Sequence, residues 1–300
     1  MPESQHLRIV AAAAGLRLDK FISEQSPEIS RSQAQRLIDE GNVRVNGKVE
    51  KSSYRIVNGD IVEIDILPVR PSHLAAEDIP VPVLFEDDDV LVVDKPAGLT
   101  VHPAPGHKSG TLVNAILSHL PLLSGESGRP GIVHRLDKDT SGVMVIAKNT
   151  VALAKLSEQF KSHTINKVYL TLVQGRLTPE QGIIEAHIGR DTGDRKKMAI
   201  AAESRGREAR TRYKVLKYIG NYSLLEVKPE TGRTHQIRVH LAAIGHPVVG
   251  DATYGFKNQI LARQFLHAHR LGFYHPRTGE YQEFTSELPS DLKQVLEKLG

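Results

Sequence analysis

The chain has 300 residues, of which 40% are hydrophobic and 25% are charged, and a formal net charge of +4. This size suits one large or two unequal globular domains, and the absence of cysteine excludes disulfides, iron–sulfur clusters and thiolate zinc sites. No apolar run approaches the roughly 18 residues of a membrane helix, and residues 9–14 are too few for a signal peptide. We therefore expect a cytoplasmic protein that does not contact a membrane.

Residues 15–66 have the pattern of a small, separate unit. Apolar residues recur at helical spacing near its start, and a β-branched stretch closes it after a tight-turn dipeptide. The predicted elements are a helix around residues 18–22, a helix capped by Ser30 that ends at Gly41, a strand at 43–45, a turn at Asn46-Gly47 and a strand at 60–66.

Short motifs in this unit resemble those of the S4-type RNA-binding module. They are Arg17-Leu-Asp-Lys20, Ser30-Arg-Ser32, Leu37-Ile38, Gly41, Val43-Arg-Val-Asn-Gly47 and Gly59-Asp60. Bulk charge does not indicate RNA binding here, because residues 15–65 contain eight basic and nine acidic side chains. The resemblance instead assigns RNA contacts to particular cations, namely Arg31, Arg36, Arg44 and Lys48.

Four prolines, at positions 68, 71, 80 and 82, predict a stiff linker over residues 67–81 before a larger domain at 82–300. Strands and helices do not alternate regularly in that domain, so we expect an α+β fold with a mainly antiparallel sheet. The predicted elements are a hairpin of 83–85 with 90–93, strands at 167–173 and 224–228, and helices at 110–119, 151–162, 234–244 and 289–299.

The segment Gly131–Gly142 carries five ionisable residues within six positions: His134, Arg135, Asp137, Lys138 and Asp139. Apolar pairs and runs flank it, so residues 132–133 and 143–146 are predicted strands on either side of a loop. A turn needs only one or two polar residues, and loops on a rigid sheet often carry catalytic groups. The density favours a functional loop over a solvated turn, which remains the alternative.

The segment 190–217 is strongly basic, with ten lysines and arginines against four acids. A mobile, solvated loop and a phosphate-binding surface explain this charge equally well. The closest group of cations, Arg195, Lys196 and Lys197, is the expected RNA contact if the second explanation holds.

Residues 230–245 form a second dense cluster. Thr234 can cap a helix that ends at Gly245 and buries Ile237, Leu241 and Ile244. His235 and Arg238 are three residues apart and so share one face of that helix. The spacing of His235, His240 and His246 is not that of metal ligands, and we expect no metal site.

These clusters together resemble the RluA family of pseudouridine synthases, over about residues 83–290 and in the family's order. The matching motifs are His134-Arg-Leu-Asp-Lys-Asp-Thr-Ser-Gly142, Lys167-Val-Tyr169, Thr231-Gly-Arg-Thr-His-Gln-Ile-Arg-Val-His240, Asp94-Lys-Pro-Ala-Gly98, Val101-His-Pro103, His246-Pro-Val-Val-Gly-Asp251 and Tyr254-Gly255. The leading RNA-binding module gives most similarity to the RluD type, which modifies large-subunit ribosomal RNA. Asp94 departs from the asparagine of many relatives, without an evident catalytic consequence.

The resemblance implies isomerisation of uridine in RNA to pseudouridine by a monomer that needs no cofactor or metal. The catalytic carboxylate maps to Asp137, and attack at C1′, attack at C6 and a glycal route all stay open. Arg238 maps to the arginine that orients this carboxylate, and Tyr169 to the tyrosine that stacks on the base and is a candidate to deprotonate C5. Arg135 is expected to fill the space left by the extruded base, with His134 as a further RNA contact.

Other functions remain possible on the residues alone. Asp137-x-Asp139-x-Ser141 is similar to the signature of haloacid-dehalogenase phosphatases, which requires a parallel sheet. A glycoside hydrolase also uses paired carboxylates, although two residues apart in a loop is uninformative spacing. The remaining alternatives are isomerisation of another RNA, such as transfer RNA, and a non-catalytic RNA-binding factor in ribosome assembly.

Overall fold

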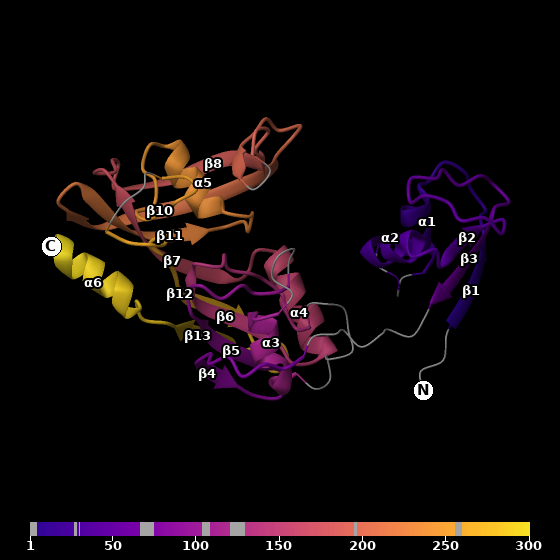
Figure 1. Cartoon of the computed structure of the whole chain (residues 1–300), viewed down its shortest axis with the longest axis horizontal. Helices are drawn as coiled ribbons and strands as arrows, with labels where there is room; N and C mark the ends of the chain where they lie inside the picture. Colours follow the sequence, from indigo (N-terminus) through magenta and orange to yellow (C-terminus); the bar gives the residue numbers. More distant parts are fainter. Residues whose placement is uncertain are drawn as a thin grey trace. The chain divides into compact units, whose positions relative to one another are not determined.

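The computed structural model describes residues 5–26, 29, 31–66, 75–103, 109–120, 130–194, 197–255 and 260–300. The chain divides into two compact units, Met1–Arg70 and Pro71–Gly300 (Figure 1). Within the described residues, no helix is long and apolar enough to cross a membrane. Each unit has its own hydrophobic core, as expected for separately packed domains.

The first unit is a three-stranded antiparallel sheet packed against two helices. Its elements are β1 (Gln5–Val10), α1 (Leu18–Gln25), α2 (Arg31–Asp39), β2 (Val43–Val45) and β3 (Ile61–Ile66), with sheet order β1-β3-β2. The predicted helices, strands and turn are present, and Asn46 and Gly47 both adopt the positive φ that an Asn-Gly turn requires. Ser30, the predicted cap of α2, lies outside the described residues.

Strand β1 was not predicted, and it precedes the range 15–66 that the sequence suggested. It pairs with β3 along its whole length, from Gln5 opposite Ile66 to Val10 opposite Ile61. Polar and apolar residues alternate only from His6 to Ile9, before the chain enters the apolar run 9–14, so the strand signal in the sequence is short. Pairing with β3 supplies the hydrogen bonds that make it a strand.

The second unit contains a ten-stranded sheet. Its strands are β4 (Val83–Glu86), β5 (Val90–Lys95), β6 (Ser141–Ala147), β7 (Asn166–Gln174), β8 (Gln181–Arg190), β9 (Met198–Ile200), β10 (Arg207–Ile219), β11 (Tyr222–Pro229), β12 (Leu266–Tyr274) and β13 (Tyr281–Thr285). The order is β4-β5-β6-β12-β7-β11-β10-β8-β9, and β13 pairs with β12. Only the β6–β12 pair is parallel among the described strand pairs, so the predicted α+β fold with a mainly antiparallel sheet is confirmed.

Helices cover the sheet of the second unit. They are α3 (Leu112–Ile116) with the short 3₁₀ helix η1 (Leu117–His119), α4 (Thr150–Lys161), α5 (Gln236–Ala243) and α6 (Ser290–Leu299). Residues of α3 pack with Leu91 and Val93 of β5, whereas residues of α4 pack with the alternate Val90 and Val92. The two helices therefore cover opposite faces, which explains why β6 is apolar and buried along its whole length.

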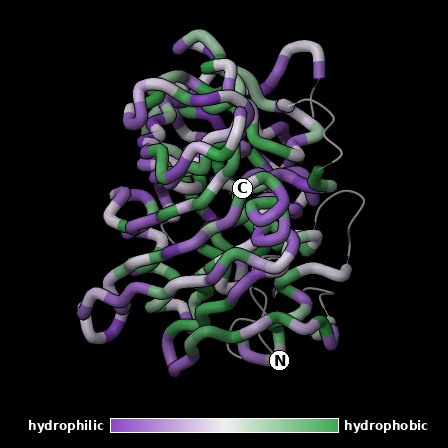
Figure 2. Tube along the Cα trace, turned by 90° about the vertical axis from the view of Figure 1, so that its left-hand side faces the viewer, coloured by the Kyte–Doolittle hydropathy of each residue, from purple (hydrophilic) through white to green (hydrophobic). Residues whose placement is uncertain are grey.

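The helices α5 and α6 complete the core at the other end of the sheet. Leu241 of α5 and Leu292 of α6 are buried with residues of β7 and β11, and α5 lies against β8 to β11 (Figure 1). Figure 2 shows the resulting alternation of hydrophobic and hydrophilic residues along the trace. Ile244, which we expected to be buried, is 40% exposed because α5 ends at Ala243.

Two further expectations about local structure are wrong. Residues 132–133 do not form a strand, because Ile132 makes only an isolated bridge to Ile146. Thr234 does not cap α5, where the preceding residue is His235 in a left-handed conformation and no side chain caps the helix. Of the two explanations left open for the basic segment 190–217, a single loop does not fit the described residues, since β9 and most of β10 lie within the segment.

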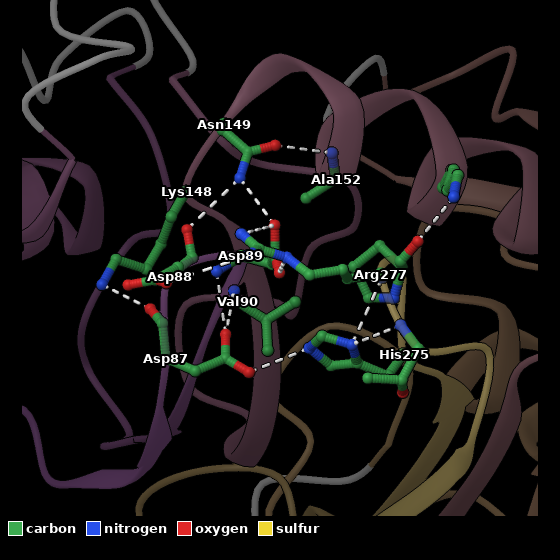
Figure 3. Close-up of polar contacts among 12 residues, drawn as sticks. Asp87, Asp88, Asp89, Val90, Lys148, Asn149, Ala152, His275 and Arg277 are labelled. Atoms are coloured by element: carbon green, nitrogen blue, oxygen red, sulfur yellow. Dashed lines mark hydrogen bonds and ion pairs between the residues drawn. The ribbon is translucent and has the colours of Figure 1, made fainter.

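An ionic cluster ties the β4–β5 turn to the turn between β12 and β13 (Figure 3). Asp87 contacts His275 at 2.9 Å, and both oxygens of Asp89 accept from Arg277. Asp87, Asp89 and His275 are close enough to hold a metal ion. Because Arg277, the Asn149 amide and backbone N–H groups already occupy these carboxylates, we interpret the cluster as structural.

Candidate active site

A pocket of about 490 Å³ in the second unit collects residues from three distant stretches of chain. The charge-dense loop contributes His134, Arg135 and Asp137, β7 contributes Tyr169, and the start of α5 contributes Arg238. Apart from the basic segment, the sequence assigned these five residues of the second unit to the site. The structure brings all five together. A larger hollow of about 680 Å³ in the first unit is formed by two short neighbouring stretches, so it unites no distant groups.

Asp137 is held by a buried arginine. Arg238 Nη1 donates to Asp137 Oδ2 at 3.0 Å, and the other side of the guanidinium donates to both oxygens of Asp251 at 2.7 and 2.8 Å. Asp251 is fully buried, whereas the side chain of Asp137 is 18% exposed to the pocket. Asp251 therefore fixes the guanidinium, which leaves one N–H edge to orient Asp137.

The charges in this triad stabilise one another. Burial opposes the ionisation of Asp251, but hydrogen bonds and charge from Arg238 outweigh it and lower the pKa of that carboxyl. Burial likewise opposes the charge on Arg238, while Asp251 and Asp137 raise the pKa of its guanidinium. The arginine is a permanent cation that faces one fixed carboxylate and one that is open to a ligand.

The buried Lys95 holds the loop that carries Asp137 in place. This side chain is fully buried, and its Nζ donates to the carbonyl oxygens of Pro96, Leu99 and Lys138 at 2.8, 2.8 and 3.0 Å. Burial lowers the pKa of Lys95 to about 7, against the attraction of Asp139 and Asp137. Because Lys138 directly follows Asp137, this lysine fixes the backbone that presents the carboxylate.

Tyr169 lies beside Asp137 on the wall of the pocket. Burial and the charge of Asp137 raise the pKa of its phenol above the ordinary value, so the residue is neutral at neutral pH. A neutral phenol can pack against a planar base, but it must lose its own proton before it can accept another. The geometry therefore fits stacking directly and a role as base only after ionisation.

The remaining wall of the pocket is cationic. Burial and the nearby Arg233 lower the pKa of Lys167 to about 8, and its Nζ donates to Thr231 O at 3.2 Å. The ring of His134 stacks on the ring of Phe160, with 4.6 Å between the two centroids, and His134 Nε2 accepts from the Val145 N–H. Burial lowers the pKa of His134 to about 3, so this residue shapes the wall as a neutral ring.

Comparison with known proteins identifies the chemistry that such a pocket performs. The family model described as RNA pseudouridylate synthase matches residues 89–243, and the S4 domain model matches residues 16–62. The chain belongs to the RNA pseudouridylate synthase family. It is an RNA pseudouridine synthase of the RluA type with an S4 domain, so the predicted family and activity are confirmed.

Relatives of the synthase match it over nearly their whole length. A Chloroflexus aurantiacus protein named as an uncharacterized RNA pseudouridine synthase is 51% identical, over 94% of this chain and 90% of its own. Ribosomal large subunit pseudouridine synthase D of Zymomonas mobilis is 41% identical, over 100% and 98%. The solved structure of human RNA pseudouridylate synthase domain containing 1 is 29% identical, with a TM-score of 0.59 over 73% of this chain and 89% of its own.

The other predicted RNA contacts of the synthase are distributed over both units. Arg135 is exposed at the pocket, and Arg44 and Lys48 are exposed on the first unit. Arg31 donates to the buried Asp19 through Nε at 3.0 Å, and Arg36 lies 4.0 Å from Glu40. Lys197 directly precedes β9, and its N–H donates to Asp194 O at 2.9 Å, whereas Arg195 and Lys196 lie outside the described residues.

The sequence did not reveal the roles of Lys95, Asp251 and Tyr254. In the sequence, each of the three stands only as part of a matching motif. A single charged residue between apolar neighbours, such as Asp251 after Val248-Val-Gly250, is the available signal for a buried partner. Which residue it pairs with depends on the fold, since Arg238 lies on a different element.

Proposed function

We propose that the synthase modifies large-subunit ribosomal RNA and that Asp137 is its catalytic carboxylate. The observation that carries this assignment is that Asp137 is the only carboxylate among the described residues that line the pocket. Relatives from Zymomonas mobilis and Xanthomonas campestris, 41% and 40% identical, are named ribosomal large subunit pseudouridine synthase D, which supports ribosomal RNA as the substrate. The S4 domain supplies a second RNA-binding surface.

The pocket has the charge that a flipped nucleotide requires. Five lysines and arginines line it, namely Arg135, Lys161, Lys167, Arg233 and Arg238. Arg238 is already paired with Asp137 and Asp251. The other four cations can neutralise the phosphates on either side of an extruded uridine, which offsets part of the free energy lost when the base leaves its stack. Transfer RNA has the same phosphates, so this argument supports RNA in general and the named relatives support ribosomal RNA.

Each residue then has one task in the isomerisation. The N1–C1′ bond breaks, the base turns, and C5 bonds to C1′; the proton of C5 leaves and N1 gains one, so the composition of the RNA is unchanged. Asp137, held by Arg238, faces the sugar or the base as nucleophile or base. Tyr169 packs against the uracil ring, and Arg135 occupies the gap in the RNA.

The test compares the wild type with Asp137→Asn on in vitro transcripts of large-subunit ribosomal RNA and of transfer RNA. Pseudouridine is located by carbodiimide modification and primer-extension stops. Asp139→Asn is the matched control, because Asp139 lies two residues away, does not line the pocket and holds the loop through its backbone carbonyl to Arg263.

We expect the wild type and Asp139→Asn to modify the ribosomal transcript and Asp137→Asn to leave it unmodified. Modification by Asp137→Asn would contradict the catalytic assignment. Modification of transfer RNA alone by the wild type would contradict the ribosomal substrate and leave the catalytic assignment intact.

A further inference from the structure

We propose that His235, in the tautomer that carries its proton on Nε2, is a positioning residue for Asp137. The inference rests on the proposed role of Asp137 and adds a second donor to the one that Arg238 provides. His235 Nε2 lies 3.8 Å from Asp137 Oδ1, while Arg238 Nη1 donates to Oδ2. The two oxygens of the catalytic carboxylate therefore face two different donors from the first turn of one helix.

The tautomer follows from the partners of Tyr254. The hydroxyl oxygen of Tyr254 accepts the Met198 N–H at 2.8 Å and lies 2.8 Å from His235 Nδ1. If the hydroxyl donates to Nδ1, then both atoms of the hydroxyl group and Nδ1 have partners, and the Nε2 proton faces the Asp137 carboxylate. If Nδ1 carries the proton instead, then the hydroxyl proton has no partner among these groups and the Nε2 lone pair faces a carboxylate. Burial lowers the pKa of His235, so the ring is neutral at neutral pH. A neutral ring that accepts at Nδ1 carries its proton on Nε2.

The contacts close into a ring around the carboxylate. Asp137 contacts Arg238, Arg238 is fixed by Asp251, and Asp251 accepts the backbone N–H of Tyr254 at 3.1 Å. The Tyr254 hydroxyl then returns to His235, which faces Asp137. The guanidinium also lies over the Tyr254 ring, with its Cζ 5.1 Å from the centroid. Tyr254 thus contacts both Arg238 and His235, the two residues that face Asp137.

The backbone at His235 supports a functional role. This residue has φ 56° and ψ 19°, a left-handed conformation that residues other than glycine rarely adopt. Left-handed residues that are not glycine concentrate at functional sites, where the surrounding structure holds them. Here the conformation turns the imidazole back towards Tyr254 and the pocket, before the chain enters α5.

A neutral donor suits this position better than a second cation. A separation of 3.8 Å is too long for a hydrogen bond, but catalytic contacts of free enzymes often shorten when substrate binds. An N–H at Oδ1 would stop the rotation of the carboxylate, so that one oxygen keeps its direction towards the nucleotide. A neutral imidazole does so without the second positive charge that would make Asp137 less reactive.

The test uses substitutions that separate the donor from the backbone. His235→Asn favours the left-handed conformation but is too short to reach Asp137. His235→Gln places its amide nitrogen near the position of Nε2 but fits the backbone less well. His235→Ala has neither property, and His246→Ala is the control, because His246 follows the other end of α5 and contacts Gln174 O outside the pocket.

Single-turnover rates are measured on a [5-³H]uridine-labelled transcript of large-subunit ribosomal RNA, together with KM and the melting temperature. We expect His235→Ala and His235→Asn to lower kcat about 10- to 100-fold at unchanged KM, because the carboxylate is no longer fixed. His235→Gln should recover most of kcat although it is no more stable than His235→Asn, and His246→Ala should match the wild type.

Activity that follows stability, with His235→Asn at least as active as His235→Gln, would overturn the inference. If the variants do not fold, long-range ¹H–¹⁵N spectra of the wild type report the tautomer directly, and a proton on Nδ1 would overturn it as well. Failure of the inference differs from failure of the proposed function. In the first case Asp137→Asn is inactive and His235→Asn is at least as active as His235→Gln, whereas in the second Asp137→Asn is itself active.

Discussion

Asp251 does not line the pocket but fixes the arginine that orients Asp137. Its carboxylate is fully buried and accepts from Arg238 Nε and Nη2, and its Oδ1 also accepts the N–H groups of Thr253 and Tyr254. Asp251→Asn keeps the shape and the oxygen that serves the two N–H groups. It replaces Oδ2, which accepts from Arg238 Nε, with an N–H₂ group, whereas Oδ1 can still accept from Nη2. The guanidinium therefore loses one of its two hydrogen bonds to this side chain and its fixed counter-charge.

The expected loss can be worked out from these contacts. Removing one partner of a buried ion pair lowers the free energy of unfolding by about 3–5 kcal/mol. The pKa of Asp251 is lowered in the folded state, so its contribution is complete above the unfolded pKa and disappears as the pH falls through the folded pKa. With one hydrogen bond and no counter-charge at position 251, the guanidinium can shift and displace Asp137, and we expect kcat to fall about 100-fold.

Chemical denaturation at neutral pH and single-turnover tritium release measure the two effects. Asp89→Asn is the matched control, since Asp89 is also a buried carboxylate with a bidentate arginine but lies outside the pocket (Figure 3). Its partner Arg277 is 62% exposed, so we expect a loss of about 1 kcal/mol and unchanged kcat. A wild-type kcat for folded Asp251→Asn would refute the reasoning that Asp251 positions Arg238.

Three further predictions concern single residues. Burial and Asp137 raise the pKa of Tyr169, so Tyr169→Phe should remove a late component from the spectrophotometric tyrosinate titration; loss of an early component would contradict this. Three partners of the buried Asp19, with Arg17 first among them, outweigh burial and lower its pKa to about 2. Asp19→Asn should therefore lower the free energy of unfolding of the first unit by about 2 kcal/mol at neutral pH. This difference should vanish as the pH falls from about 4 to about 2, and hydrogen exchange over residues 18–45 measures it. Gly142→Ala should lower the free energy of unfolding by about 3 kcal/mol or more, because φ is 120° and a Cβ would overlap the backbone of Ala268. Gly220 is the control, with φ 54° and open space around the position of a Cβ. In the same denaturation assay, Gly220→Ala should lower the free energy of unfolding by only about 1 kcal/mol.

Local patterns in the sequence were sufficient for most elements of the fold. Short apolar runs predicted β4 and β5, and alternating residues predicted β7 and β11, near their observed positions; helical spacing predicted α4 and α6 within about two residues. Strands with weak alternation were missed. Strand β10 (Arg207–Ile219) is an example, because its outward side chains are mainly polar and gave the segment a charge pattern that is also typical of a loop. Its inward side chains pack beneath α5.

The sequence by itself was sufficient to predict the residues of the proposed site, because charge density distinguished the loop of Asp137 and the family resemblance added Tyr169 and Arg238. Only the tertiary structure decided how they are held. The left-handed His235, the pairing of Arg238 with Asp251 and the burial of Lys95 under the Asp137 loop join residues up to about a hundred positions apart. Such partners satisfy buried charges across elements, and no periodicity along the chain records which element will lie beside which.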